Sequence, residues 1–174
     1  PPRSFLLQND GKGRFRDVTE TVCPELINPG LVTSAIWTDF DNDGWKDLIV
    51  TGEWMALTFF KNDHGKLKKW AKNPDIDSSA GWWFSIAEGD FDKDGDLDVT
   101  VQRRSDDNKV NWYEYRNDDE WISHFIGIAE DGQLGAVAVD VNRNGFTDLV
   151  LGHMWFQNPG ILDTNPNAEW TKHY

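Results

Sequence analysis

A segment of about 50 residues recurs along the chain, and this repeat constrains the fold more than any other feature. The stretches DFDNDGWKDLIV, DFDKDGDLDVTV and DVNRNGFTDLVL begin at residues 39, 90 and 140. Alternating small and apolar residues precede each stretch, and an apolar cluster ending in Asn follows it, as LTFFKN, NWYEYRN or MWFQN. Alternation with a period of two, closely spaced turn residues and many aromatic side chains predict strands, and no helix is predicted.

Each repeat unit predicts four antiparallel strands, which is the arrangement of a β-propeller blade. The first strand ends at the first Asp of an acidic loop, the second follows the loop, the third carries the Asn-ended cluster, and the fourth follows a turn. The N-terminal FLLQNDGKGRFRDVTE matches only the last two strands. We expect an all-β, partial or assembling propeller of about three and a half blades in one structural domain. Its expected parts are a half blade with a connector in residues 1–30 and blades in residues 31–80, 81–130 and 131–174.

A repetitive β-sandwich is the alternative fold, although sandwiches do not usually have so constant a period. The apolar content supports a folded chain in either case. Ten Trp and ten Phe residues are too many for a disordered acidic segment.

The acidic loops place oxygen-bearing side chains at alternate positions, so that the oxygen atoms can converge on one point. If the first Asp is position 1, Asp or Asn recurs at positions 3, 5 and 9, and Gly at position 6 permits a sharp turn. Position 7 would offer its backbone carbonyl, so its side chain is free to vary. The candidate ligands are Asp39, Asp41, Asp43, Trp45 and Asp47 in the first loop, Asp90, Asp92, Asp94, Asp96 and Asp98 in the second, and Asp140, Asn142, Asn144, Phe146 and Asp148 in the third.

Oxygen ligands without imidazole or thiolate favour Ca²⁺ over zinc or copper. An EF-hand would need a Glu at position 12, where this chain has Val50, Val101 and Leu151. An Asx-rich turn without metal is the alternative, but three copies with the same oxygen positions favour calcium. We therefore expect up to three Ca²⁺ ions, with the third site weakest because amides replace two of its carboxylates.

The charge of the chain excludes some classes of partner. The formal net charge is −13 at pH 7 and no basic stripe is present, which argues against nucleic acid binding. No apolar run reaches the roughly 18 residues of a membrane helix, so no membrane span is expected.

The segment DFDNDGWKDLIV and its two companions resemble the FG-GAP/VCBS repeat family, known from integrin α-subunit propellers and secreted bacterial proteins. The stretch from FLLQNDGKGRFRDVTE through GWWFSIAEGDFDKDGDLDV is also similar to the ASPIC/UnbV-type, cartilage-acidic-protein-like group. The resemblance implies a calcium-stabilised propeller that is secreted or at the cell surface and serves adhesion, binding or structure. It also implies calcium at positions 1, 3, 5, 7 and 9 of the three loops.

We expect no catalytic activity, because the paired acids serve as calcium ligands and no GxSxG, HExxH or phosphate loop is present. The alternative function is a carbohydrate-active enzyme or a carbohydrate-binding propeller. Trp82 and Trp83 could stack on a sugar, although core packing is the preferred interpretation. The expected partners are other copies of the chain, which could self-assemble, or the rest of a longer propeller, because open ends would expose apolar blade faces. A protein or glycan ligand is a further candidate.

Overall fold

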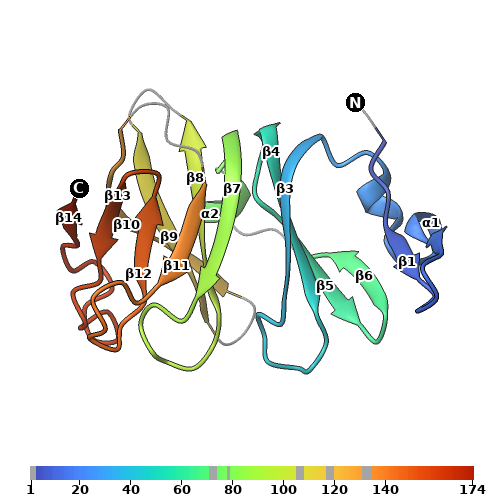
Figure 1. Ribbon diagram of the computed structural model, residues 1–174. Helices are drawn as coiled ribbons and strands as arrows, with labels where there is room; N and C mark the ends of the chain where they lie inside the picture. Colours follow the sequence, from blue (N-terminus) through green and yellow to red (C-terminus); the bar gives the residue numbers. More distant parts are fainter. Residues whose placement is uncertain (1–2, 71–73, 78, 105–107, 117–119, 131–134) are drawn as a thin grey trace.

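The computed structural model describes residues 3–70, 74–77, 79–104, 108–116, 120–130 and 135–174. Antiparallel strands dominate it and form a row of sheets, with the N-terminal hairpin at one end and the C-terminal sheet at the other (Figure 1). The predicted all-β fold of propeller-type blades is confirmed. The row does not close on itself.

Four groups of strands follow one another along the row. The half blade consists of β1 (Leu7–Asn9) and β2 (Phe15–Asp17). The first blade consists of β3 (Leu31–Thr38), β4 (Asp47–Met55), β5 (Thr58–Asp63) and β6 (Lys66–Lys69). The second blade consists of β7 (Gly81–Gly89), β8 (Asp98–Arg104), β9 (Lys109–Arg116) and β10 (Glu120–Ile128). The third blade consists of β11 (Ala136–Val139), β12 (Asp148–Leu151), β13 (Met154–Gln157) and β14 (Thr171–His173).

Strands pair in chain order within each blade, as the repeat predicts. One connection differs from that expectation, because β4 also pairs with β7. The partners are Glu53 with Trp82 and Met55 with Gly81, and they join the first two blades into one continuous sheet. The expectation of no helix is also wrong in detail. The described residues include two four-residue helices, α1 (Thr19–Val22) and α2 (Pro74–Asp77), and a 3₁₀ turn, η1 (Pro24–Ile27).

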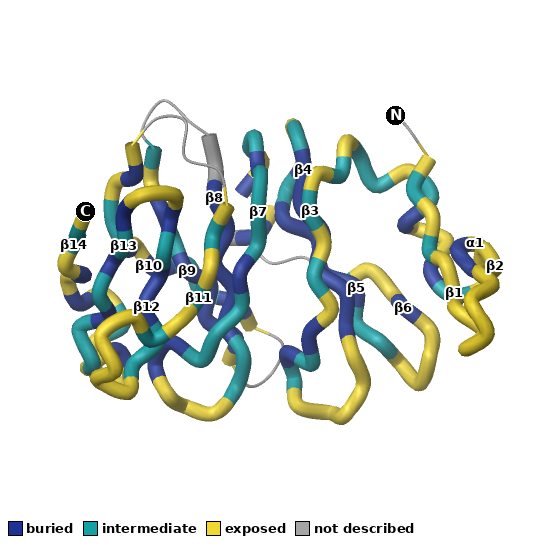
Figure 2. Tube along the Cα trace, viewed as in Figure 1, coloured by how far each residue is buried: buried dark blue, intermediate teal, exposed yellow. Residues whose placement is uncertain are grey.

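Three apolar cores lie between successive members of the row, and they hold it together. Successive strand residues point to opposite faces, so each central strand supplies two cores. In β4, Leu48 and Val50 belong to the core beside the half blade, whereas Ile49 belongs to the core shared with the second blade. Burial of one such side chain stabilises the fold by about 1.5–3 kcal/mol. Figure 2 shows buried residues along the strands and exposed residues in the connecting loops.

Candidate metal centre

The three acidic loops connect the first two strands of each blade and lie along the same edge of the row, at the bottom of Figure 1. Neighbouring loops contact one another. The side-chain amide of Asn42 donates to the carbonyl of Gly95 at 3.3 Å, which links the first loop to the second. The ammonium of Lys93 lies 4.2 Å from the centre of the Phe146 ring, which links the second loop to the third. The candidate sites therefore form a continuous row.

Left-handed residues at two positions wind each loop tightly. At position 6, φ is 88° in Gly44, 99° in Gly95 and 88° in Gly145, and glycine adopts these angles without steric strain because it lacks a Cβ. Position 4 is also left-handed, in Asn42, Lys93 and Arg143. The sequence pattern indicated the first of these positions but gave no signal for the second.

In the first loop, oxygen atoms of Asp39, Asp41 and Asp43 lie within 4.8 Å of one another. Backbone amides hold the loop in shape, because Gly44 donates to Asp39 Oδ2 at 3.1 Å and Asp43 donates to Asp41 Oδ1 at 3.3 Å. Asp39 Oδ1, however, is buried and has no hydrogen-bond partner. Three carboxylates thus crowd together, and one of them has a buried oxygen atom that lacks a donor.

The second loop has the same crowding with a different set of positions. Oxygen atoms of Asp90, Asp92 and Asp98 lie within 4.8 Å of one another, and Asp90 Oδ1 is buried without a hydrogen-bond partner. Burial, reinforced by neighbouring carboxylates, raises the pKa of Asp98 to about 9 and that of Asp92 to about 6. These shifts show that the site disfavours its own negative charge.

The third loop has the same backbone but fewer carboxylates. Asp140 accepts hydrogen bonds from the amides of Asn144 at 3.1 Å and Gly145 at 2.8 Å. Asn142 Oδ1 accepts a bond from the Asn144 amide at 3.0 Å. All residues of this loop are described, and no group of three acidic side chains forms in it. Its charge is therefore the least suited to a divalent cation.

The Asp at position 9 is buried in every loop and joins the loop to the third strand of its blade. One of its oxygen atoms accepts the backbone amide of loop position 2, and the other accepts an amide of the third strand or the residue after it. The donors are Phe40 and Asn62 for Asp47 (3.3 and 2.7 Å), Phe91 and Tyr115 for Asp98 (3.0 and 3.4 Å), and Val141 and Asn158 for Asp148 (2.9 and 2.8 Å). Position 9 therefore stabilises the fold whether or not it also binds a cation.

These bonds revise the repeat alignment in the second blade. Asn62 and Asn158 end their clusters, and their side chains donate to the carbonyls of Lys46 and Thr147 at 2.7 and 3.0 Å. In the second blade Tyr115 takes the equivalent place, two residues before the Asn of NWYEYRN, and that Asn lies outside the described residues. The alignment of the three clusters at their final Asn is therefore wrong for this blade.

One residue precedes the third-strand amide donor of each position-9 Asp, and its identity differs in each blade. This residue changes the charge beside the loop. In the first blade it is Lys61, whose ammonium lies 2.6 Å from Asp41 Oδ2. In the second it is Glu114, which contacts His124 Nε2 at 2.6 Å and Arg116 Nε at 2.7 Å. In the third it is Gln157, which contacts His173 Nε2 at 3.0 Å. The first loop therefore already has one carboxylate neutralised from within the protein.

We expect the cation-free protein to lose stability as the pH rises from about 4 to about 9. The pKa of Asp98 is about 9 in the folded chain, against about 3.9 for an exposed Asp, so the folded state binds this proton more tightly than the unfolded state. That stabilisation is complete below the lower value and is lost as Asp98 ionises. The measurement is the thermal midpoint in EDTA at pH 5, 7 and 9.

The control is Asp98→Asn, which removes the group with the highest of the raised pKa values and should reduce the pH dependence, most of all between pH 7 and pH 9. A midpoint of the unsubstituted protein that rises between pH 5 and pH 9 would contradict the expectation.

None of the helices among the described residues is long and apolar enough to cross a membrane. No curated protein matches the chain at a significant level. The FG-GAP-like repeat family matches residues 3–50 and, in a second overlapping match, residues 39–101. Together the matches cover the half blade, the first blade and the first two acidic loops, which is more than half of the 174 residues. The chain therefore belongs to the FG-GAP-like repeat family, as its loop motifs predicted.

Proposed function

We propose that this chain is a calcium-binding propeller module with an extracellular adhesion, binding or structural role and no catalytic function. One observation carries the proposal. Asp39 Oδ1 and Asp90 Oδ1 are buried without a hydrogen-bond partner, each within a group of three carboxylates. A buried oxygen without a donor costs free energy, and like charges at this spacing repel one another. A bound cation would remove both penalties.

The donor set selects the kind of cation. Calcium takes six to eight oxygen ligands, including carboxylates and backbone carbonyls, and tolerates irregular geometry. The side chains at positions 1, 3, 5 and 9 and the carbonyl at position 7 would supply them. Position 9 can take part although it already accepts two amides, because a carboxylate has about four lone-pair sites.

An extracellular location would suit loops that bind calcium with modest affinity. Extracellular calcium modules bind with dissociation constants of roughly 10⁻⁴ to 10⁻³ M, and calcium at these concentrations is typical of extracellular surroundings. The acidic chain would also lose two negative charges for each ion bound. Calorimetric titration with Ca²⁺, repeated with Mg²⁺, tests the proposal, which predicts that calcium binds more tightly. Equal or weaker calcium binding would contradict it.

We expect the three loops to bind calcium unequally, and Lys61 to weaken the first of them. The second loop has five acidic side chains, the first has four with Asp41 paired to Lys61, and the third has two. Lys61→Met removes the competing ammonium and keeps the apolar stem, so the first loop should bind calcium about tenfold more tightly. Calorimetric titration of the variant measures this change.

Lys12→Met, in the exposed hairpin of the half blade, is the matched control and should leave calcium affinity unchanged. By the same reasoning, Asp92→Ala should reduce stability in calcium more than Asn142→Ala. Unchanged or weaker calcium binding in Lys61→Met would show that Lys61 does not compete with the cation.

Glycan binding is a second candidate function, and a row of stacked aromatic rings that starts at an exposed Trp favours it. Trp54 is 75% exposed and has a φ of 59°, which is unusual for a bulky residue and often marks a functional site. Its ring stacks on Trp82 at 5.6 Å, and Trp82 stacks on Phe84 at 6.1 Å. Trp83, in contrast, is buried in the core between the first two blades. A glycan array probed with the unsubstituted protein and with Trp54→Ala tests this function, which requires binding that the substitution abolishes.

A further inference from the structure

The outer face of the third blade lacks the cover that the other blades have. At loop position 2, Phe40 and Phe91 are 0% exposed because the next blade packs on them, whereas Val141 is 42% exposed. In the third strand, Phe59 and Trp112 are buried in the same way, but the equivalent Trp155 is only half-buried. The third blade thus presents an apolar surface at the positions where a further blade would pack.

This apolar surface extends across β11, β12 and β13 and reaches His173 of β14. Strand pairing aligns Val137 with Val150, Val150 with Trp155, and Trp155 with His173. The rings of Trp155 and His173 stack at 4.2 Å, which holds the Trp ring in place. We define the third-blade face by Val137, Val139, Val141, Val150 and Trp155.

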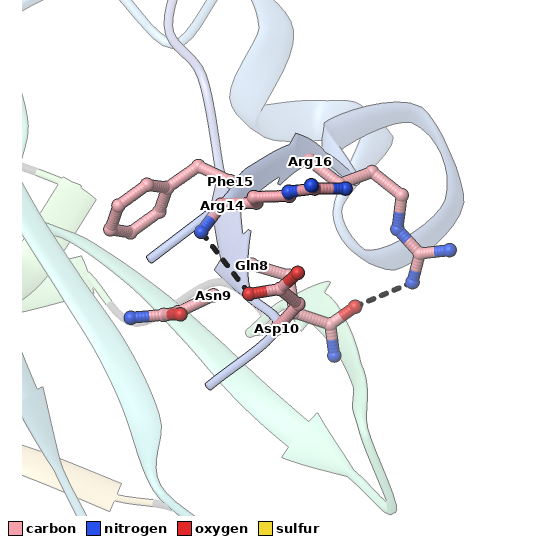
Figure 3. Close-up of a pocket in the computed structure, with 6 residues that line it drawn as sticks. All are labelled: Gln8, Asn9, Asp10, Arg14, Phe15 and Arg16. Carbon is pink, nitrogen blue, oxygen red and sulfur yellow. Dashed lines mark hydrogen bonds between the residues drawn. The ribbon is translucent and has the colours of Figure 1, made fainter. Parts of the chain in front are cut away.

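The half blade has an uncovered face at the opposite end of the row. Leu6 packs against the core beside the first blade, whereas its neighbours Phe5 and Leu7 are both exposed. Phe15 is 63% exposed, and Figure 3 shows its ring on the opposite side of the hairpin from the hydrogen bond between Arg16 and Gln8. We define the half-blade face by Phe5, Leu7 and Phe15.

Phe15 occupies a position that is buried in the first and second blades. It pairs with Asn9 as Leu67 pairs with Asn62 and as Trp121 pairs with Tyr115, and both of those equivalents are buried. The internal interface shows what such a residue contacts. Trp121 lies 4.4 Å from Phe59 and 5.5 Å from Phe40 of the preceding blade, measured between ring centres.

We propose that the chain associates head to tail, with the half-blade face of one copy packed on the third-blade face of a second copy. The contact repeats the way in which successive members of the row pack on one another inside the chain. It therefore places Phe15 of one copy against Trp155 and Val141 of the other. The two end segments also differ in net charge, because residues 3–17 contain four basic and two acidic side chains, whereas residues 135–174 contain two basic and four acidic ones, and this difference favours association of unlike ends.

Such a contact is heterologous, so repeated association closes a ring or extends a filament. Two copies of three and a half blades would give about seven, which is within the range of about four to eight blades in known propellers. Light scattering coupled to size exclusion, over a range of protein concentrations, should therefore give masses of at least twice the 20.0 kDa of one chain.

Two variants test the polarity of the contact. Phe15→Glu removes one face and Val141→Glu removes the other, and both positions are exposed, so the fold should survive, as a thermal melt can verify. Each variant alone should be monomeric. An equal mixture should form a one-to-one dimer that grows no further, because each variant keeps the face that the other lacks.

Trp54→Ala is the control, because its exposed side chain belongs to neither face, and it should associate like the unsubstituted protein. A protein that stays at 20.0 kDa at every concentration would overturn the proposal and would leave both faces to a different partner, such as another blade of a longer propeller. Association of either variant alone, or no dimer in the mixture, would also overturn it.

Discussion

Chelation of calcium is expected to lower the thermal midpoint of this protein by about 10 °C or more. An ion that binds only the folded state, at 100 times its dissociation constant, stabilises that state by about 2.7 kcal/mol. Two occupied loops would therefore contribute about 5 kcal/mol, and each kcal/mol shifts the midpoint of a chain of this size by about 2–4 °C. Differential scanning calorimetry in about 10 mM calcium, which is 100 times a dissociation constant of roughly 10⁻⁴ M, and then in excess EDTA measures the difference.

The double variant Asp39→Asn, Asp90→Asn is the control for this experiment. It removes the charge of the two buried oxygen atoms that lack donors, so calcium should stabilise it less than the unsubstituted protein. It should also be no less stable in EDTA, because two of the repelling carboxylates are gone. An identical midpoint with calcium and with EDTA in the unsubstituted protein would show that no cation stabilises the fold.

Asp148→Ala should destabilise the protein by about 2–6 kcal/mol even without calcium. Its carboxylate accepts the amides of Val141 and Asn158, and each buried amide left without an acceptor costs about 1–3 kcal/mol. The third loop is the weakest candidate for calcium, so this variant separates the structural role of position 9 from cation binding. Urea unfolding in EDTA gives the free energy of unfolding directly.

Asn144→Ala is the matched control in the same loop. Its side chain accepts one exposed hydrogen bond, from the Phe146 amide at 2.9 Å, so its loss should cost less than about 1 kcal/mol. Equal effects of the two substitutions would mean that Asp148 does not hold the loop against the third strand.

The sequence predicted the parts of the fold that depend on local patterns. Strand alternation, loop spacing and Gly at position 6 are properties of short segments, and they predicted the blade strands and the acidic loops. The pairing of Glu53 with Trp82 was not predictable in this way, because it depends on how one blade meets the next. The Asn-ended cluster misled for a similar reason, since Tyr115 supplies through its backbone amide the bond that Asn supplies elsewhere.

The candidate sites, like the fold, were predictable from the sequence only in part. The loop motif indicated the acidic residues, and the structure brings three carboxylates together in each of the first two loops. The loop motif could not indicate that Lys61 reaches Asp41, because Lys61 lies in β5, outside the motif, and only the folded blade brings it to the loop. Nor could it indicate that Asp47, Asp98 and Asp148 each hold two backbone amides, since those donors lie in separate elements.

The number of calcium ions bound per chain distinguishes a calcium-binding module from a fold that needs no metal. Equilibrium dialysis against radioactive calcium, at free concentrations up to several millimolar, counts them without any assumption about stability. We expect at least two ions per chain, in the first and second loops, with a third that binds last. The Asp39→Asn, Asp90→Asn variant should bind fewer ions. A chain that binds no calcium over this range would show that the acidic loops are not calcium sites.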